Sequence, residues 1–241
     1  MKIINIALLG FGTVGSGVYE AIRQNNDKYE KTLGLRLEIK KILVSNISKK
    51  RDIDTALLTD NIDEAITDDI DIVIEVMGGI DFAKKCILTA FSKGKSVVSA
   101  NKDLIANFGK ELYEAADKNK VFFMYEASVC GGIPILRTIK EHLSGEKISE
   151  VTGIVNGTTN FILTKMYQKY GLTFDTVLSE AQELGYAEAD PTADVEGLDA
   201  ARKVAILASL CFSAYVTFDD VYSEGTVGRS EERRVGKECR S

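Results

Sequence analysis

The sequence has few of the residues that carry metal, disulfide or histidine chemistry. Its 241 residues include no tryptophan, two prolines, four cysteines and one histidine. The cysteines stand far apart with no C-x-x-C pair, so buried free thiols are expected rather than a zinc site or a disulfide framework. His142 falls near the end of an amphipathic segment, where a solvated helix end is expected. Acid–base chemistry is therefore expected from lysine, carboxylate or tyrosine.

A basic surface and a long apolar run are also missing. The net charge is −6 at pH 7, which argues against a nucleic-acid partner because phosphates bind a basic face. No apolar run approaches the ~20 residues that a membrane helix needs, so no membrane partner is expected. The first residues, MKIINIALLG, show no signal-peptide pattern. These absences predict a cytoplasmic protein.

Short apolar runs alternate with helical patterns in the first half. The runs predict buried strands over residues 3–9, 37–44, 70–76, 96–99 and 121–125. The helical patterns cover residues 15–24, 81–93 and 109–119. This alternation predicts an α/β fold, a Rossmann-type doubly wound parallel sheet, over residues 1–135. Ligands of such sheets bind beyond the carboxyl ends of the strands.

A glycine-rich turn follows the first predicted strand and opens the first predicted helix. It reads Gly10-Phe11-Gly12-Thr13-Val14-Gly15. In this position the pattern favours a dinucleotide site. Gly10 permits the tight turn, Gly12 lets a pyrophosphate approach the backbone, and Gly15 lets helix and strand pack closely. A tight turn without a ligand is the alternative.

The end of the second predicted strand indicates which nicotinamide cofactor fits. An acidic residue there would bind the 2′-hydroxyl of NAD. The chain instead reads VSNISKKR over residues 44–51, with no carboxylate and three cations. This favours NADP over NAD, with Lys49 or Arg51 near the 2′-phosphate. A solvated basic loop is the alternative.

The pattern changes beyond Pro134, so a domain boundary is expected near residues 130–138. The second half predicts a helix over residues 135–143, a strand over 148–155, a polar turn over 156–160, and helices over 161–170, 174–184 and about 195–212. Thr173 is expected to cap the second of these last three helices and Gly185 to end it. We therefore expect an incomplete α/β domain over residues 136–228.

Residues 229–241 change character abruptly. They read RSEERRVGKECRS, which is highly charged and has no apolar period. The string resembles a translated sequencing-library adapter, and a native disordered tail is the alternative. We expect this segment to contribute nothing to the fold.

Charged residues in two stretches are hard to explain by packing alone. Lys102 follows the predicted strand 96–99, where its side chain would point into the cofactor crevice. Asp199 and Lys203 are four residues apart in a helical pattern, so they share one face. Alone, such a pair is typical of a surface salt bridge. Glu188, in a glycine-flanked turn nearby, favours a functional site.

Five segments resemble successive signatures of homoserine dehydrogenases. In chain order they are GFGTVGSGV, SANKDLIA, YEASVCGGIPIL, GIVNGTTNFILTKM and GYAEADPTADVEGLDAARKVAILA, within residues 1 to about 227. The resemblance implies NAD(P)H-dependent, reversible reduction of L-aspartate 4-semialdehyde to L-homoserine, on the route to threonine, methionine and isoleucine. It also implies that the second domain binds substrate and forms a homodimer.

The resemblance implies a role for individual residues. Those against the cofactor are Phe11, Thr13 and Val14, with Lys102 also in the active-site crevice. Those that hold the substrate are Glu188 and Asp199, with Thr158 and Gly185 lining the site. Lys203 matches the catalytic proton donor, and Lys102 is its catalytic neighbour.

The segment YEASVCGGIPI resembles a monovalent-cation site built largely from main-chain carbonyls. The matching residues are Glu126, Val129, Gly131 and Ile133. Oxygen ligands suit a hard cation such as sodium. A plain domain-linking turn is the alternative. Cys130 departs from the pattern, because many relatives carry a small residue, often glycine, at this position.

Two other functions fit parts of the sequence. Another dehydrogenase with this cofactor domain, such as an aspartate dehydrogenase, would in many cases use a catalytic histidine, and His142 is poorly placed for that role. A non-catalytic cofactor sensor would keep the glycine turn, but it would not need Glu188, Asp199 and Lys203 together. Aldehyde-dependent oxidation of NADPH distinguishes these alternatives.

The purified chain is expected to show weak or no turnover. Homoserine dehydrogenases continue beyond the segment that ends at Gly225 and return to complete the cofactor domain, and some append a regulatory domain. An unpaired sheet edge and an exposed core would leave this length marginally stable. Aspartate-semialdehyde-dependent oxidation of NADPH measures this. Turnover near that of a full-length relative would contradict the expectation.

Overall fold

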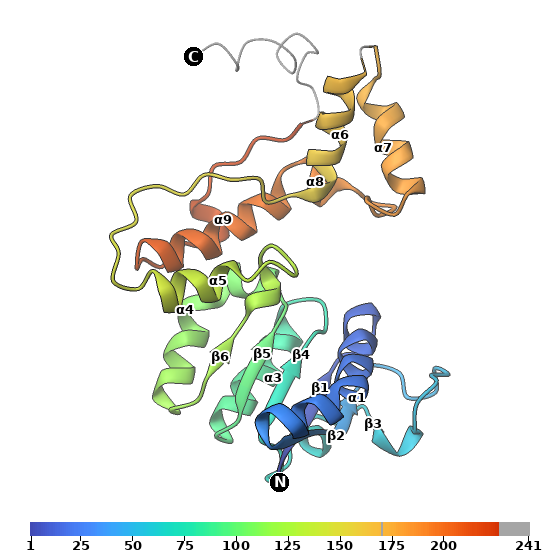
Figure 1. Cartoon of the computed structure of the whole chain (residues 1–241), viewed down its shortest axis with the longest axis vertical. Helices are drawn as coiled ribbons and strands as arrows, with labels where there is room; N and C mark the ends of the chain where they lie inside the picture. Colours follow the sequence, from blue (N-terminus) through green and yellow to red (C-terminus); the bar gives the residue numbers. More distant parts are fainter. Residues whose placement is uncertain (170, 227–241) are drawn as a thin grey trace. The chain divides into compact units, whose positions relative to one another are not determined.

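The computed structural model describes residues 1–169 and 171–226. The chain divides into two compact units, Met1–Pro134 and Ile135–Ser241 (Figure 1). The tail expected over residues 229–241 lies outside the described residues.

The first unit is built on a six-stranded parallel sheet with the order β3-β2-β1-β4-β5-β6. Its strands are β1 (Lys2–Leu9), β2 (Leu35–Leu43), β3 (Leu58–Thr59), β4 (Ile72–Glu75), β5 (Ser96–Ser99) and β6 (Phe123–Met124). This is the strand order of a dinucleotide-binding sheet, so the predicted α/β class is confirmed. Strand β3 was not predicted.

Helices connect these strands. They are α1 (Thr13–Leu33), α2 (Ile62–Ala65), α3 (Asp81–Ser92) and α4 (Lys102–Lys118) (Figure 1). From β1 the chain moves to β2 in one direction along the sheet, and from β4 through β5 to β6 in the other. Right-handed crossovers therefore place α1 on one face of the sheet and α3 and α4 on the opposite face.

Helices α1 and α4 are longer than predicted. The second half of α1 is polar, but buried Asn26 exchanges two side-chain hydrogen bonds with the main chain of Leu37, at 2.9 and 3.0 Å. These hydrogen bonds attach the helix to β2. Helix α4 begins at Lys102 and kinks at Phe108, where φ is −126°. The kink separates its first turn from the regular pattern further along.

The centre of the sheet positions the candidate site. Leu9 of β1 lies opposite Glu75 of β4, and Glu75 lies opposite Ser99 of β5. All three are final residues of parallel strands, so the loops that follow them meet at one edge of the sheet. The order in which successive strands are added reverses between β1 and β4, and ligands of such sheets bind at this switch point.

The second unit is helical over its described residues. Its helices are α5 (Ile135–Arg137), a π-helical turn (Thr138–His142), α6 (Gly157–Gln168), α7 (Phe174–Glu183), α8 (Thr192–Val195), α9 (Leu198–Cys211) and a 3₁₀ turn (Phe218–Asp220). Helices α6 and α7 enclose a small core of Ile162, Met166, Val177, Ala181 and Ala187. Thr173 caps α7 by accepting a hydrogen bond from the Thr176 amide, as predicted.

Two sequence predictions for this unit are wrong. Residues 148–155 form no strand, and Val151 and Ile154 are exposed. A strand needs a neighbour for its N–H and C=O groups, and the described part of this unit contains no other strand. The polar turn expected over residues 156–160 is instead the start of α6. The helix expected over about 195–212 is present as α9, which begins after Gly197, whose φ is +78°.

The described residues contain no helix that is both long and apolar enough to cross a membrane.

Substitution of two glycines in α1 should have opposite effects on stability. A Cβ at Gly15 would clash with the carbonyl of Gly10, whereas a Cβ at Gly17 would meet nothing within 4 Å. Gly15→Ala should lower the free energy of unfolding by about 1–3 kcal/mol through overpacking. Gly17→Ala should raise it by about 0.5–1 kcal/mol, because alanine loses less entropy in a helix. Urea denaturation measures both, and equal shifts would contradict the packing argument.

Candidate active site

The glycine turn has the steric features expected of a phosphate-binding loop. Gly10 has a φ of +102°, and a Cβ there would lie 2.8 Å from the carbonyl oxygen of Val76. A Cβ on Gly15 would clash with Gly10, whereas Gly12 faces open space. The steric roles expected of Gly10 and Gly15 are thus confirmed. The open side of Gly12 leaves room for a ligand beside the backbone, and cofactor contact stays a prediction.

The residues between these glycines fall into two groups. Thr13 and Val14 are exposed on the first turn of α1, whose N-cap Gly12 provides no side-chain cap. The first amides of a helix have no partner within the helix and attract anions. Phe11 instead packs edge-on against Tyr19, with ring centroids 5.7 Å apart, and contacts the apolar cluster around Leu8. Its aromatic ring therefore helps to hold the turn against the core.

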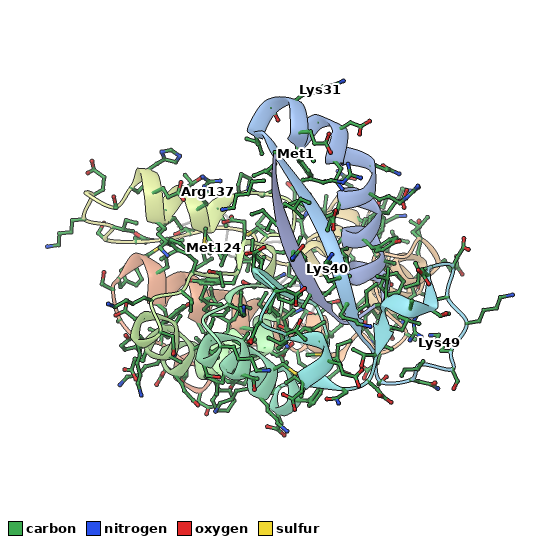
Figure 2. All side chains as sticks on the ribbon, turned by 90° about the horizontal axis from the view of Figure 1, so that it is seen from below. Met1, Lys31, Lys40, Lys49, Met124 and Arg137 are labelled. Atoms are coloured by element: carbon green, nitrogen blue, oxygen red, sulfur yellow. The ribbon has the colours of Figure 1, made fainter. Side chains whose placement is uncertain are left out.

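The two cations proposed for the 2′-phosphate differ in their contacts. Both belong to the loop that follows β2, on which Lys49 is exposed (Figure 2). One guanidinium nitrogen of Arg51 donates to the carbonyl oxygens of Asn46 and Lys49, each at 2.9 Å. Arg51 thus stabilises the conformation of its own loop. Lys49, by contrast, carries an exposed ammonium group on the same loop.

Lys102 is the first residue of α4 and is half-buried. The preceding Asn101 caps this helix, because its side-chain oxygen accepts a hydrogen bond of 3.1 Å from the Leu104 amide. The side chain of Asn101 also donates to the carbonyl of Gly79 at 2.7 Å. The start of α4 is therefore held against the loop after β4.

Glu75 was missed by the sequence reasoning. Its side chain is fully buried and accepts hydrogen bonds from the Ser99 hydroxyl at 2.6 Å and from the Met77 amide at 2.8 Å. Burial raises the pKa of Glu75, and the hydrogen bonds from Ser99, Met77 and the Asn101 side chain oppose that shift. An acid that ends the apolar run IVIE was the available signal.

A pocket of about 760 Å³ lies in the second unit. It is lined by Asn156, Gly157, Thr158, Asn160, Phe161, Thr164, Lys165, Gln168, Lys169, Tyr186, Asp194, Asp199 and Lys203. Three of the predicted site residues, Thr158, Asp199 and Lys203, are therefore brought together. Charged groups of both signs line the pocket, as a zwitterionic ligand would require.

The Asp199–Lys203 pair is buried at this pocket. The Lys203 ammonium donates to an Asp199 carboxylate oxygen at 2.6 Å and to the carbonyl oxygen of Val155 at 2.7 Å. The side chains are only 8% and 17% exposed, respectively. The pair is therefore not a surface salt bridge, and removal of either partner would leave a buried charge, which is costly.

Asn156 links this pair to a second acid, Asp194. From the sequence, neither Asn156 nor Asp194 was predicted as a site residue. The amide nitrogen of Asn156 donates to Asp194 at 2.6 Å and to Asp199 at 2.9 Å. Its side-chain oxygen accepts hydrogen bonds from the amide and hydroxyl of Thr159, each at 2.8 Å, and so caps α6. The sequence predicted a polar turn here, whereas Asn before Gly-Thr-Thr begins a helix.

The remaining predicted substrate residues differ in position. The Thr158 hydroxyl donates to the carbonyl of Tyr186 at 2.7 Å, which ties α6 to the turn after α7. Gly185 has a φ of +77° at that turn. Glu188 is exposed, and neither Gly185 nor Glu188 lines the pocket. The pocket presents Asp194 instead, as a second carboxylate beside Asp199.

The segment expected to bind a cation forms a tight turn. Glu126 begins a 3₁₀ turn and is half-buried, Val129 is buried, and Ile133 is exposed. Cys130 and Gly131 have φ values of +60° and +56°, and the first is a conformation that favours glycine. No cluster of three His, Cys, Asp or Glu ligands occurs among the described residues. A carboxylate with main-chain oxygens is a donor set that fits a hard monovalent cation.

Asn156→Ala should destabilise the second unit more than the loss of a helix cap alone. Loss of the cap costs about 1 kcal/mol, and removal of a donor from a buried carboxylate adds about 1–3 kcal/mol. Thr173→Ala is the matched control, because exposed Thr173 caps α7 without a contact to Asp199. Urea denaturation measures both variants. Equal losses would show that the bond from Asn156 to Asp199 adds no stability.

Two family models match this chain. One, described as homoserine dehydrogenase, NAD binding domain, matches residues 10–126. The other, described as homoserine dehydrogenase, matches residues 134–238 and runs into the charged tail that begins at Arg229. The first match covers the glycine turn and strands β2 to β6 of the parallel sheet, and the second includes the pocket.

Known proteins agree with these matches. The homoserine dehydrogenase of Bacillus subtilis is 52% identical over 228 residues, a match that covers 93% of this chain and 52% of the relative. The crystal structure of a homoserine dehydrogenase from Thiobacillus denitrificans is 43% identical with a TM-score of 0.86, over 93% of this chain and 52% of that chain. A hyperthermophilic archaeal homoserine dehydrogenase in complex with NADPH is 30% identical with a TM-score of 0.75, over 88% of this chain and 70% of that chain.

The chain spans about half the length of the curated relatives it matches. The matches nonetheless include both units, and the archaeal structure is covered over more than two thirds of its length. The chain belongs to the homoserine dehydrogenase family.

Proposed function

We propose that this chain carries the cofactor site and the substrate pocket of an enzyme that interconverts L-aspartate 4-semialdehyde and L-homoserine with a nicotinamide cofactor. The observation that carries the proposal is the buried Lys203 ammonium, held by Asp199 at 2.6 Å on the wall of a polar pocket. A carbonyl reductase needs such a proton donor beside its substrate.

The first unit is proposed to bind NADP in preference to NAD. The glycine turn at the start of α1 would hold the pyrophosphate against free amides, with Phe11, Thr13 and Val14 beside it. Lys49 would meet the 2′-phosphate, and Arg51 would shape the loop through its two carbonyl contacts. The NADPH complex of the archaeal relative supports this choice.

The substrate is proposed to bind in the pocket of the second unit. Its ammonium group would pair with Asp199, beside Thr158 on the pocket wall. Glu188, exposed on the turn after Gly185 and outside the pocket lining, is proposed to reach the same ammonium group. Lys169 brings positive charge to the pocket, where it would balance the substrate carboxylate, whereas Lys165 is paired with Glu180. Such pairing would fix the aldehyde in one orientation.

When bound, the nicotinamide supplies hydride to the aldehyde carbon. Lys203 would donate a proton to the carbonyl oxygen, and its positive charge would stabilise the negative charge that develops there. Asp199 and the carbonyl of Val155 fix the direction of the ammonium group. Lys102, from the start of α4, is proposed to add a second positive charge at the reacting end of the cofactor.

A monovalent cation such as sodium is proposed at the turn after β6. Glu126, Val129, Gly131 and Ile133 would supply its oxygen ligands, and the paired positive φ values at Cys130 and Gly131 support a chain shaped for such a site. We also propose that a form extended to the length of the curated relatives is a homodimer through the second domain. Sedimentation of that form tests the dimer.

Removal of the Lys203 amine should abolish most turnover. Lys203→Ala should lower the turnover number by about 10²–10⁴-fold, the range typical of a general acid. The reaction is followed as aspartate-semialdehyde-dependent oxidation of NADPH, in this chain and in a chimera that continues residues 1–226 with the second half of the Bacillus subtilis relative.

Lys147→Ala is the matched control, because Lys147 is exposed outside the pocket. It should leave turnover within about twofold, since exposed charges contribute little. Near-normal turnover of Lys203→Ala in the chimera would refute the role of Lys203. A chimera that oxidises NADPH only with another carbonyl substrate would refute the proposed reaction.

A further inference from the structure

Glu75 is a buried acid beside the point, between β1 and β4, at which the strand order of the parallel sheet reverses. It ends β4, directly opposite Leu9 of β1 and Ser99 of β5, and its exposed fraction is 0%. Burial of a carboxylate is costly unless each oxygen is hydrogen-bonded. Strands beside it end in leucine and serine, so the packing of the sheet does not by itself require an acid here.

The two carboxylate oxygens of Glu75 connect two different loops. One accepts from the Met77 amide at 2.8 Å, in the loop after β4. The other accepts from the Ser99 hydroxyl at 2.6 Å, at the start of the loop after β5. The Ser99 oxygen in turn accepts from the Asn101 amide at 3.0 Å. A single side chain therefore couples both loops.

This coupling extends to the start of α4 and to the glycine turn. Asn101 donates to Gly79 at 2.7 Å and caps the helix that begins with Lys102. On the other side, Val76 follows Glu75 directly, and its carbonyl oxygen would contact a Cβ on Gly10 at 2.8 Å. The Glu75 carboxylate is thus linked to three segments, namely the loops after β4 and β5 and the glycine turn. All three lie at the edge of the sheet where ligands bind.

We propose that Glu75 is a positioning residue that fixes the loops after β4 and β5 around the nicotinamide end of the bound cofactor. The proposal rests on the proposed cofactor site of the first unit. Glu75 would act on the bound cofactor indirectly, through Met77 and through the segment Ser99–Asn101–Lys102. Its two hydrogen bonds set the spacing of these loops and the orientation of the first turn of α4.

Ser99→Ala and Ser96→Ala form a matched pair at opposite ends of β5. The first removes the hydroxyl that bonds Glu75, and the second removes the hydroxyl that accepts from the Phe122 amide at 3.2 Å. Ser99→Ala should weaken NADPH binding by about tenfold, the effect of losing a charge-assisted hydrogen bond. Ser96→Ala should leave binding within about twofold. Fluorescence titration with NADPH measures both, and urea midpoints report the stability that each loses.

Amide hydrogen exchange tests the coupling without a ligand. Ser99→Ala should speed exchange at Met77, which belongs to a different loop, and Ser96→Ala should not. Glu75→Gln keeps the shape of the side chain but replaces one acceptor with a donor, so it should have the same effect. In the double variant Glu75→Gln/Ser99→Ala, exchange at Met77 should be no faster than in Glu75→Gln alone. Both substitutions act on the same Glu75–Ser99 hydrogen bond, so their effects should not add.

The outcomes separate the two proposals. If the unsubstituted chain does not bind NADPH, the proposed cofactor function fails, and exchange at Met77 alone decides whether Glu75 couples the loops. If the chain binds NADPH but Ser99→Ala binds it as Ser96→Ala does, the positioning role of Glu75 is overturned while the cofactor site stands. Unchanged exchange at Met77 in both Ser99→Ala and Glu75→Gln also overturns it.

Discussion

The close approach of Gly15 to Gly10 is the contact on which the first unit depends. A side chain at either position would push the glycine turn away from Val76, at the centre of the sheet. Because β1 and β4 are neighbours, that displacement would open the edge where Leu9 and Glu75 lie opposite each other. The packing of the turn against Val76 thus requires glycine at positions 10 and 15. The same close packing leaves the backbone at the start of α1 open beside Gly12.

The second unit depends on a different constraint, the burial of Asp199. A buried carboxylate needs donors, and here they come from Lys203, one helical turn away, and from Asn156, which lies far away in the sequence. Asn156 also starts α6 and contacts Asp194. One acid therefore determines where α6 begins relative to α9 and which way the Lys203 ammonium points.

Both units use polar groups that packing alone would not require. Glu75 in the sheet and Asp199 at the pocket are each surrounded by donors that also fix loops or helix starts. Hydrogen bonds to charged groups are stronger than those between neutral groups, so such residues hold their surroundings in one arrangement. The proposed hydride transfer and proton donation would require this rigidity of the groups that position a substrate.

Residue patterns alone were enough to predict the parallel α/β sheet, the glycine turn, the cap at Thr173 and the shared face of Asp199 and Lys203. Each depends on local periodicity or on steric rules that act over a few residues. Other features depend on partners that are distant in sequence, so they are visible only in the folded chain: the pocket contacts of Asn156 and Asp194, the burial of Glu75, and the exposed coil at residues 148–155. An apolar run becomes a strand only beside another strand, and a polar residue becomes part of a site only when the fold brings its hydrogen-bonding partner to it.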